Sequence, residues 1–362
     1  MSNTICPQCG LKPIHPGFKH CGRTCAIAAT AAPSLAPTPA PVRNSGFVQF
    51  NRTGPLPAGG APSQLQTPWQ NQGAINPFPT NSGSPQCAYP GCPKPPYDHR
   101  AMYCSNTHRE QAVTDGHAIG CLLCRTFPKM LGFYCGKVCQ DQAIAAAPMV
   151  LPLEAGDPKF ADIVNQFDAS WRHTNKPKPE VKYVYKINQS EVITFNYARY
   201  RDAVEARGNF IAQRRSPGNE CRRWHGTRRT CTLGDDPDDA ELCGSSSCPL
   251  CCIISTNFKR ELINTSGRSF NRFGVGIYAS ATSSKSDDYC SNGTFSPYKA
   301  MLLTHVVVGK GIKLTQDSTT LTDAPSGYDS VLGETGGSLK YDEVVVYNNA
   351  AIQPAWLVVY GP

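Results

Sequence analysis

The sequence contains no apolar run that approaches the roughly 20 residues needed to span a bilayer. Its first residues, MSNTIC, lack the basic and apolar stretches of a secretory signal. Both absences predict an intracellular protein, cytoplasmic or nuclear, without a membrane partner. Because an intracellular protein is expected to keep its thiols reduced, the 18 cysteines among the 362 residues need a reason other than disulfides.

Acidic residues are missing from residues 32–86, where Arg43 and Arg52 are the only charged side chains. This stretch is rich in Pro, Ala, Gly, Ser, Asn and Gln, a composition that cannot bury a core. We therefore expect residues 32–86 to form a disordered linker. It separates a Cys-rich segment, residues 1–31, from a second one, residues 87–146.

Long basic runs and stripes of aromatic and basic residues are also missing, although the formal charge is +8. Residues 1–140 hold eleven Lys/Arg against three Asp/Glu, whereas the remainder is balanced. Three zinc sites built from deprotonated thiols would subtract about five charges from this half. Nucleic acid therefore stays open as a partner without a strong indication, and a protein partner is at least as well supported.

The cysteines recur with one spacing, which predicts three metal-binding units. We name these the first Cys unit (residues 1–31), the second Cys unit (87–116) and the third Cys unit (117–146). Their expected ligands are Cys6, Cys9, Cys21 and Cys25 in the first; Cys87, Cys92, Cys104 and His108 in the second; and Cys121, Cys124, Cys135 and Cys139 in the third. In the second unit, His99 and His117 remain alternatives to His108.

The spacing of the ligands suits a tetrahedral zinc ion. A short knuckle supplies two thiolates from one turn, and ligands four residues apart lie on one face of a helix. Four such ligands satisfy tetrahedral zinc and leave no open position for catalysis. Units this small bury little apolar surface, so the metal would supply their folding energy.

A fourth cluster of cysteines lies in a loop rich in Gly, Ser and Asp. A structural zinc is the preferred interpretation here, with free thiols, or Cys252 in place of Cys251, as the alternatives. The expected ligands are Cys231, Cys243, Cys248 and Cys251.

Three short segments in the last part of the chain carry residues suited to NAD chemistry. They are residues 224–227 (WHGT), 273–278 (FGVGIY) and 341–347 (YDEVVVY), with 284–289 (SKSDDY) between the last two. Breaking the nicotinamide–ribose bond passes through an oxocarbenium-like state. A Gly backbone can approach the amide closely, two tyrosines can stack on the ring, and a carboxylate can stabilise the cation.

These segments, in this order, resemble the catalytic domain of poly(ADP-ribose) polymerases, the diphtheria-toxin-like ADP-ribosyltransferases with a His-Tyr-Glu triad. The resemblance implies that Glu343, His225 and Tyr278 are catalytic. It further implies that His225, Gly226 and Ser286 bind NAD, that Tyr278 and Tyr289 stack on nicotinamide, and that Lys285 is the family's lysine beside the second tyrosine.

The resemblance covers about residues 158–362 and implies an α+β chain with the ADP-ribosyltransferase fold and mostly antiparallel sheets. Apolar periodicity agrees with it. It predicts helices over 160–171 and 195–207, the second ended by Gly208, and strands over 181–187, 299–308 and 356–360, with Glu343 on another strand.

The expected function is an NAD-dependent ADP-ribosyltransferase, a pentosyltransferase that uses NAD as substrate, releases nicotinamide and modifies a protein acceptor, with zinc as a structural cofactor. An NAD glycohydrolase with the same site residues is one alternative, and a non-enzymatic zinc-dependent interaction protein is another. The sequence does not distinguish mono- from poly-transfer. Since no triad residue precedes His225, we expect the Cys units to target the enzyme and a 150–362 fragment to keep NAD turnover.

Overall fold

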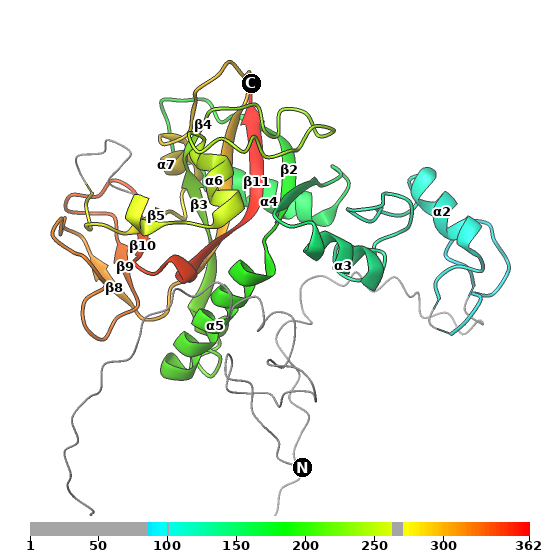
Figure 1. Cartoon of the computed structure of the whole chain (residues 1–362), viewed down its shortest axis with the longest axis horizontal. Helices are drawn as coiled ribbons and strands as arrows, with labels where there is room; N and C mark the ends of the chain where they lie inside the picture. The colour runs from blue at the N-terminus through cyan, green and yellow to red at the C-terminus, as the bar shows by residue number, and fades with distance from the viewer. Residues whose placement is uncertain (1–85, 100, 263–270) are drawn as a thin grey trace, which may run out of the picture. The chain divides into compact units, whose positions relative to one another are not determined.

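Two β-sheets form the centre of the computed structural model, which describes residues 86–99, 101–262 and 271–362 (Figure 1). The first Cys unit and nearly all of the predicted linker therefore lie outside the described residues. Every neighbouring pair in the five-stranded sheet is antiparallel. Its strands, in spatial order, are β1 (Met149–Pro152), β2 (Glu180–Asn188), β11 (Ile352–Gly361), β7 (Lys299–Val307) and β3 (Glu220–Gly226).

The four-stranded sheet pairs antiparallel except between β8 and β9, which are parallel. Its strands, in spatial order, are β5 (Ile277–Ala279), β10 (Glu343–Val346), β9 (Ser330–Gly333) and β8 (Gly311–Leu314). The short strands β4 (Arg228–Arg229) and β6 (Ser291–Asn292) form a parallel pair. The prediction of an α+β chain with mostly antiparallel sheets is therefore confirmed.

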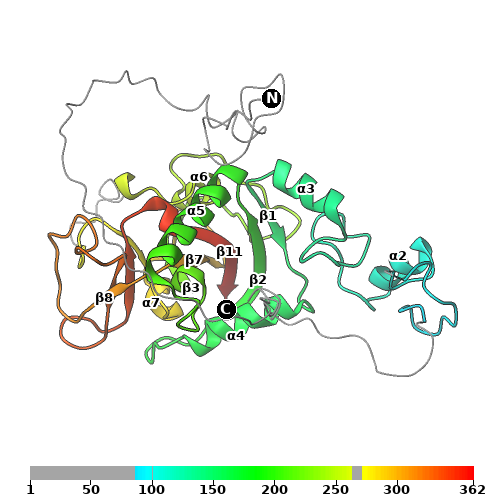
Figure 2. The ribbon, with the colours of Figure 1, turned by 90° about the horizontal axis from the view of Figure 1, so that it is seen from below.

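Apolar side chains cover both faces of the larger sheet, which explains why β7 and β11 are buried along nearly their whole length. On one face, Leu302 and Leu357 pack with Val344 of the smaller sheet and with Leu250 of α6 (Pro249–Thr256). On the other face lies α4 (Pro158–Ala169) (Figure 2), which contributes Ile163 and Phe167 to the core. The two sheets thus share one core, and α4 closes the outer face.

Two of the described helices, α4 and α5 (Glu191–Gly208), begin at polar capping residues. Asp157 precedes α4 and accepts a hydrogen bond from the Lys159 amide at 2.8 Å. Ser190 caps α5, so this helix starts four residues before the predicted Phe195. It includes Gly208 and ends at Asn209, which has a φ of 49° in the left-handed region. The remaining helices are α2 (Asn106–Thr114), α3 (Lys137–Ala145) and α7 (Ser283–Asp287).

The larger sheet begins before the predicted domain boundary at residue 158. Strand β1 pairs with β2 from Met149 onward and forms the sheet's edge. The apolar pattern predicts no strand there, because four residues are too few to show alternation. Strand β1 therefore belongs to the larger sheet although it lies outside the residues 158–362 predicted for the catalytic domain.

The third Cys unit packs on the larger sheet. Leu122, Tyr134 and Cys139 belong to the same buried cluster as Trp356 and Phe167. Polar contacts add to this packing: Asn188 donates to the Tyr134 hydroxyl at 2.7 Å, and Lys129 forms a 2.7 Å ion pair with the buried Asp157.

None of the helices in the described residues combines the length and apolar character needed to cross a membrane.

Candidate active site

The two sheets meet at a cavity of about 200 Å³. Trp224 on β3 and Ser280 after β5 exchange backbone hydrogen bonds of 2.8 and 2.9 Å, which brings the edges of the sheets together. The cavity is lined by residues of β3, β5, α7 and β10, by two residues that precede β5, and by one residue after β5 and one after α7. They are Trp224, His225, Gly226, Asn271, Arg272, Tyr278, Ala279, Ser280, Lys285, Ser286, Tyr289 and Glu343.

Every residue for which the sequence suggested a role in NAD binding or catalysis lines this cavity. His225 is oriented by the Tyr278 carbonyl, 2.8 Å from its Nδ1. A proton on Nδ1 makes this a hydrogen bond and leaves Nε2 as an acceptor. The ring also packs edge-on against Phe258 at a centroid distance of 4.8 Å.

Gly226 is a position where the backbone leaves no room for a side chain. A Cβ there would lie 1.9 Å from the Ser286 carbonyl oxygen and 3.0 Å from the Tyr289 Cβ. The bare backbone of Gly226 therefore packs directly on the segment that carries Ser286 and Tyr289. This close approach keeps the Gly226 peptide at the wall of the cavity.

Replacing Gly226 with alanine should push the Ser286–Tyr289 segment away from β3. We expect NAD binding to weaken at least about tenfold, because the walls of the cavity would shift by a large part of an ångström. Titration calorimetry with NAD measures this effect. Gly156→Ala is the control for loss of a glycine, since a Cβ added at Gly156 would have no atom within 4 Å and its φ lies outside the left-handed region; wild-type affinity in Gly226→Ala would contradict the expectation.

Tyr278 is locked in place through its hydroxyl, which donates to the Gly274 carbonyl at 2.8 Å and accepts from the Phe273 amide at 2.9 Å. Gly274 has a φ of +67°, and a Cβ there would collide with the Leu321 backbone. Burial raises the pKa of Tyr278, so its hydroxyl stays neutral and can donate. The ring is thus a fixed wall of the cavity.

Glu343 begins β10 and is buried inside the cavity. Its Oε1 lies 3.1 Å from Lys285 Nζ, and its Oε2 has no hydrogen-bond partner among the described residues. Lys285 also donates to the Tyr289 hydroxyl at 3.1 Å. Burial alone would lower the pKa of Lys285, but Tyr289 and the charge of Glu343 raise it overall. The site therefore contains a carboxylate with one oxygen paired with Lys285 and one buried without a hydrogen-bond partner among the described residues.

Asp342, the residue before Glu343, fixes the start of β10 to the loop after β5. Its carboxylate accepts from the Ser280 hydroxyl at 2.9 Å, the Ala281 amide at 2.7 Å and the Thr282 hydroxyl at 2.8 Å. The sequence interpretation missed this role, although Asp342 stands in the segment that it singled out. Arg272 and Asn271, which also line the cavity, were missed because no pattern marks them.

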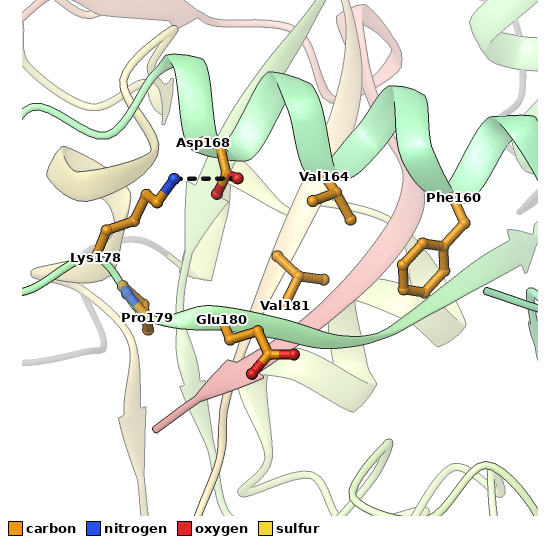
Figure 3. A pocket seen from close by; sticks show the side chains of 7 residues that line it. All are labelled: Phe160, Val164, Asp168, Lys178, Pro179, Glu180 and Val181. Atoms are coloured by element: carbon orange, nitrogen blue, oxygen red, sulfur yellow. Dashed lines mark ion pairs between the residues drawn. The ribbon is translucent and has the colours of Figure 1, made fainter.

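A larger hollow of about 390 Å³ lies between α4 and the start of β2 (Figure 3). Phe160, Val164 and Val181 form its apolar surface, and Lys178 pairs with Asp168 at 3.1 Å across one end. None of the candidate catalytic residues lines it. The smaller cavity is the better candidate because it holds a buried carboxylate, a histidine and two tyrosines.

Three sets of Cys and His ligand atoms converge in the described residues, and within each set they lie within 4.8 Å of one another. Tetrahedral zinc with Zn–S bonds of about 2.3 Å requires sulfurs about 3.8 Å apart. The pairs Cys92–Cys104, Cys124–Cys135 and Cys231–Cys248 are separated by 3.7, 3.7 and 3.8 Å. Because a disulfide needs about 2 Å, these distances fit a shared metal ion.

The three sets have the composition that the sequence predicted for the described part of the chain. They are Cys87, Cys92, Cys104 and His108; Cys121, Cys124, Cys135 and Cys139; and Cys231, Cys243, Cys248 and Cys251.

The positions of the side chains also favour particular ligands where the sequence left alternatives open. His108 Nδ1 lies 3.4 Å from Cys104 Sγ, whereas His117 packs edge-on against Tyr89. Cys252 Sγ faces the carbonyl oxygens of Ser245 and Ser246 instead of the other cysteines. Burial opposes ionisation of Cys124, but backbone amides of Phe127 and Thr126 lower its pKa to about 7. The Cys and His residues of the three sets could hold zinc.

We expect elemental analysis to give close to four zinc ions in the full chain and close to three in an 84–362 fragment. Cys251→Ser should remove one zinc, because it takes away a buried ligand. The matched change Cys252→Ser should leave the count unchanged. Two zinc ions in both the wild-type fragment and Cys251→Ser would exclude the site in the catalytic region.

Arg229 holds the loop of the last metal set in place, although no sequence pattern marked it. Its guanidinium is 1% exposed and donates to the Asp235 carboxylate at 2.7 Å, the Leu233 carbonyl at 2.7 Å and the Tyr298 carbonyl at 2.8 Å. A buried guanidinium with this many acceptors is well satisfied. It fixes one end of the loop that contains Cys231 and Cys243.

Comparison with known families agrees with this geometry. Residues 241–337 match the family described as Poly(ADP-ribose) polymerase catalytic domain. The match includes Tyr278, Ser286 and Tyr289; His225 precedes it and Glu343 follows it. A search of curated proteins found no match to the chain. Over residues 241–337, the chain therefore resembles the catalytic domain of poly(ADP-ribose) polymerases, a domain with the ADP-ribosyltransferase fold.

Proposed function

We propose that this protein is an NAD-dependent ADP-ribosyltransferase that transfers ADP-ribose to a protein acceptor. The observation that carries the proposal is the position of Glu343. Its carboxylate is buried in the same small cavity as His225, Gly226, Tyr278 and Tyr289. A buried carboxylate of this kind is suited to stabilise a cation that forms inside the cavity.

The reaction breaks the bond between the nicotinamide nitrogen and the ribose carbon. Nicotinamide leaves with the bonding electron pair, the acceptor nucleophile forms a new bond to the same carbon, and its proton is released. In our proposal, Glu343 accepts hydrogen bonds from the ribose and stabilises the developing positive charge. The ring nitrogen Nε2 of His225 accepts a hydrogen bond from a ribose hydroxyl.

The remaining residues would orient the leaving group. The Gly226 backbone and Ser286 would bind the nicotinamide amide, while Tyr278 and Tyr289 would stack on its ring. Lys285 would pair with Glu343 in the buried site and hold Tyr289 in place through its hydroxyl. Zinc, where the cysteine sets hold it, would stabilise structure and take no part in the reaction, because four protein ligands leave no open position.

Incubating the purified full chain with NAD labelled in the adenylate tests the proposal. With a protein fraction present, label should become attached to protein while nicotinamide is released. Release of free ADP-ribose with no labelled protein would instead favour an NAD glycohydrolase. If no NAD is consumed and none is bound, the proposal of an NAD enzyme is wrong, and an interaction protein becomes the better interpretation.

A further inference from the structure

The segment that follows α4 contacts two parts of the chain that carry cavity-lining residues: α7, and the residues just before β10. It comprises residues 170–176, which connect α4 to the approach of β2. The Ser170 carbonyl accepts from the Ser283 amide at 3.2 Å, and the Arg172 amide donates to the Ser284 hydroxyl at 2.9 Å. The start of α7 is therefore held by a part of the chain far away in sequence.

His173 lies in this segment with 8% of its side chain exposed. Its Nδ1 is 3.0 Å from the Tyr341 hydroxyl, and its Nε2 is 3.1 Å from Asp288 Oδ1. A proton on Nε2 satisfies both contacts, because the Tyr341 hydroxyl then donates to Nδ1 while Nε2–H donates to the carboxylate. The ring also packs edge-on against Trp171 and Tyr341.

The two partners of His173 belong to two different walls of the cavity, one formed by residues 283–289 and the other by residues 341–346. Tyr341 comes two residues before Glu343, and Asp288 comes immediately before Tyr289. Neither His173, Tyr341 nor Asp288 is among the lining residues. The imidazole therefore connects the two walls through residues that do not line the cavity.

We propose that His173 is a positioning residue, which holds the wall carrying Tyr289 at a fixed distance from the strand carrying Glu343. The inference rests on the proposed function for its effect on turnover. Its structural content is independent of that function, because the imidazole joins the same two walls whichever ligand the cavity takes.

A second contact on the same carboxylate provides a matched control. Lys176 also pairs with Asp288, at 2.9 Å, but its other ion pair is with Asp287 at 3.6 Å on the same wall. Removing Lys176 takes a charge from one wall and leaves the connection between the walls intact. Removing the His173 imidazole breaks the link between Tyr341 and Asp288 and leaves the Lys285–Glu343 ion pair in place.

The test compares His173→Phe, His173→Gln, Tyr341→Phe and Lys176→Met in the full chain. We expect His173→Phe to lower kcat for NAD about 10- to 100-fold with KM within about threefold, since small misplacements of reacting groups are costly. Tyr341→Phe should act in the same direction, and the double variant should add little. His173→Gln, which can reach only one partner, should fall between, and Lys176→Met should stay within about twofold of wild type.

Hydrogen exchange gives a measurement that does not depend on turnover. In His173→Phe, exchange should accelerate at both 283–289 and 341–345, whereas in Lys176→Met it should change at most in 283–289. An unchanged kcat together with unchanged exchange in a folded His173→Phe would overturn the inference. If the wild type consumes no NAD, the proposed function fails, while the exchange pattern still decides the role of His173. If His173→Phe does not fold, Tyr341→Phe carries both measurements.

Discussion

Replacing Glu343 with glutamine should lower the turnover of NAD by a factor of about 10² to 10³ while changing NAD affinity by less than about fivefold. Glutamine keeps the size of the side chain and removes its charge. The charge matters most when the bond to nicotinamide breaks and positive charge develops on the ribose. The loss should therefore appear in kcat, since binding of the intact substrate depends mainly on shape and stacking.

The buried setting of Glu343 makes this effect large. Its side chain is 7% exposed, so water screens its charge poorly, and its Oε2 has no partner among the described residues. Steady-state kinetics and calorimetric titration of NAD measure the two quantities separately. Glu334→Gln is the matched control, because Glu334 pairs with Lys313 at 2.6 Å on the surface and both side chains are largely exposed. Equal turnover in Glu343→Gln and the wild type would remove Glu343 from the reaction.

Much of the candidate site was predictable because its residues stand in short segments. His225 and Gly226 are adjacent, Lys285, Ser286 and Tyr289 share one helix and its end, and Glu343 starts a strand of valines. The resemblance to poly(ADP-ribose) polymerases rests on such short segments, so it implied roles for these residues before their positions were known. The same holds for the metal ligands, whose spacing defines each set before any fold is known.

The rest of the site depends on contacts between distant parts of the chain. His173 meets Tyr341 and Asp288 only because α4 packs across the larger sheet and brings its last turn to α7. Asp342 is as close to Glu343 in sequence as any residue, yet its role comes from three donors in the loop after β5. A single sequence carries no signal for such pairs.

The packing of the third Cys unit on the larger sheet is a feature of the fold that the sequence also did not predict. Phe133 meets Trp356 at a centroid distance of 5.5 Å, and Lys186 lies 6.0 Å from the Phe133 ring and 5.4 Å from that of Trp356. Composition and spacing described the unit as a separate module. Only the structure shows that one face of it belongs to the core of the larger sheet.

A fragment of residues 150–362 should consequently be much less stable than a fragment of residues 84–362. The shorter fragment loses Leu122 and Tyr134 from the buried cluster, as well as the first residue of β1. Removing two large buried side chains costs on the order of 5 kcal/mol, a large share of the roughly 5–15 kcal/mol that stabilises a typical domain. We expect Tm to fall by about 10–20 °C for a catalytic region of this size.

Thermal unfolding followed by circular dichroism measures the difference between the fragments. Within the 84–362 fragment, Cys139→Ser should reproduce part of the loss, because Cys139 lies both in the third metal set and in the buried cluster. Cys252→Ser is the control for loss of a thiol outside the three sets. Equal Tm values for the two fragments would show that the third Cys unit is independent of the sheet.

The 150–362 fragment should nevertheless be as active per folded molecule as the 84–362 fragment, although it is less stable. Among the described residues, none before Trp224 lines the candidate cavity, so the third Cys unit supports the sheet without contributing to the site. At low temperature, where a measurable fraction of the 150–362 fragment is folded, NAD turnover per folded molecule should match that of the 84–362 fragment. Turnover that stays absent in a demonstrably folded 150–362 fragment would mean that the Cys units shape the active site itself.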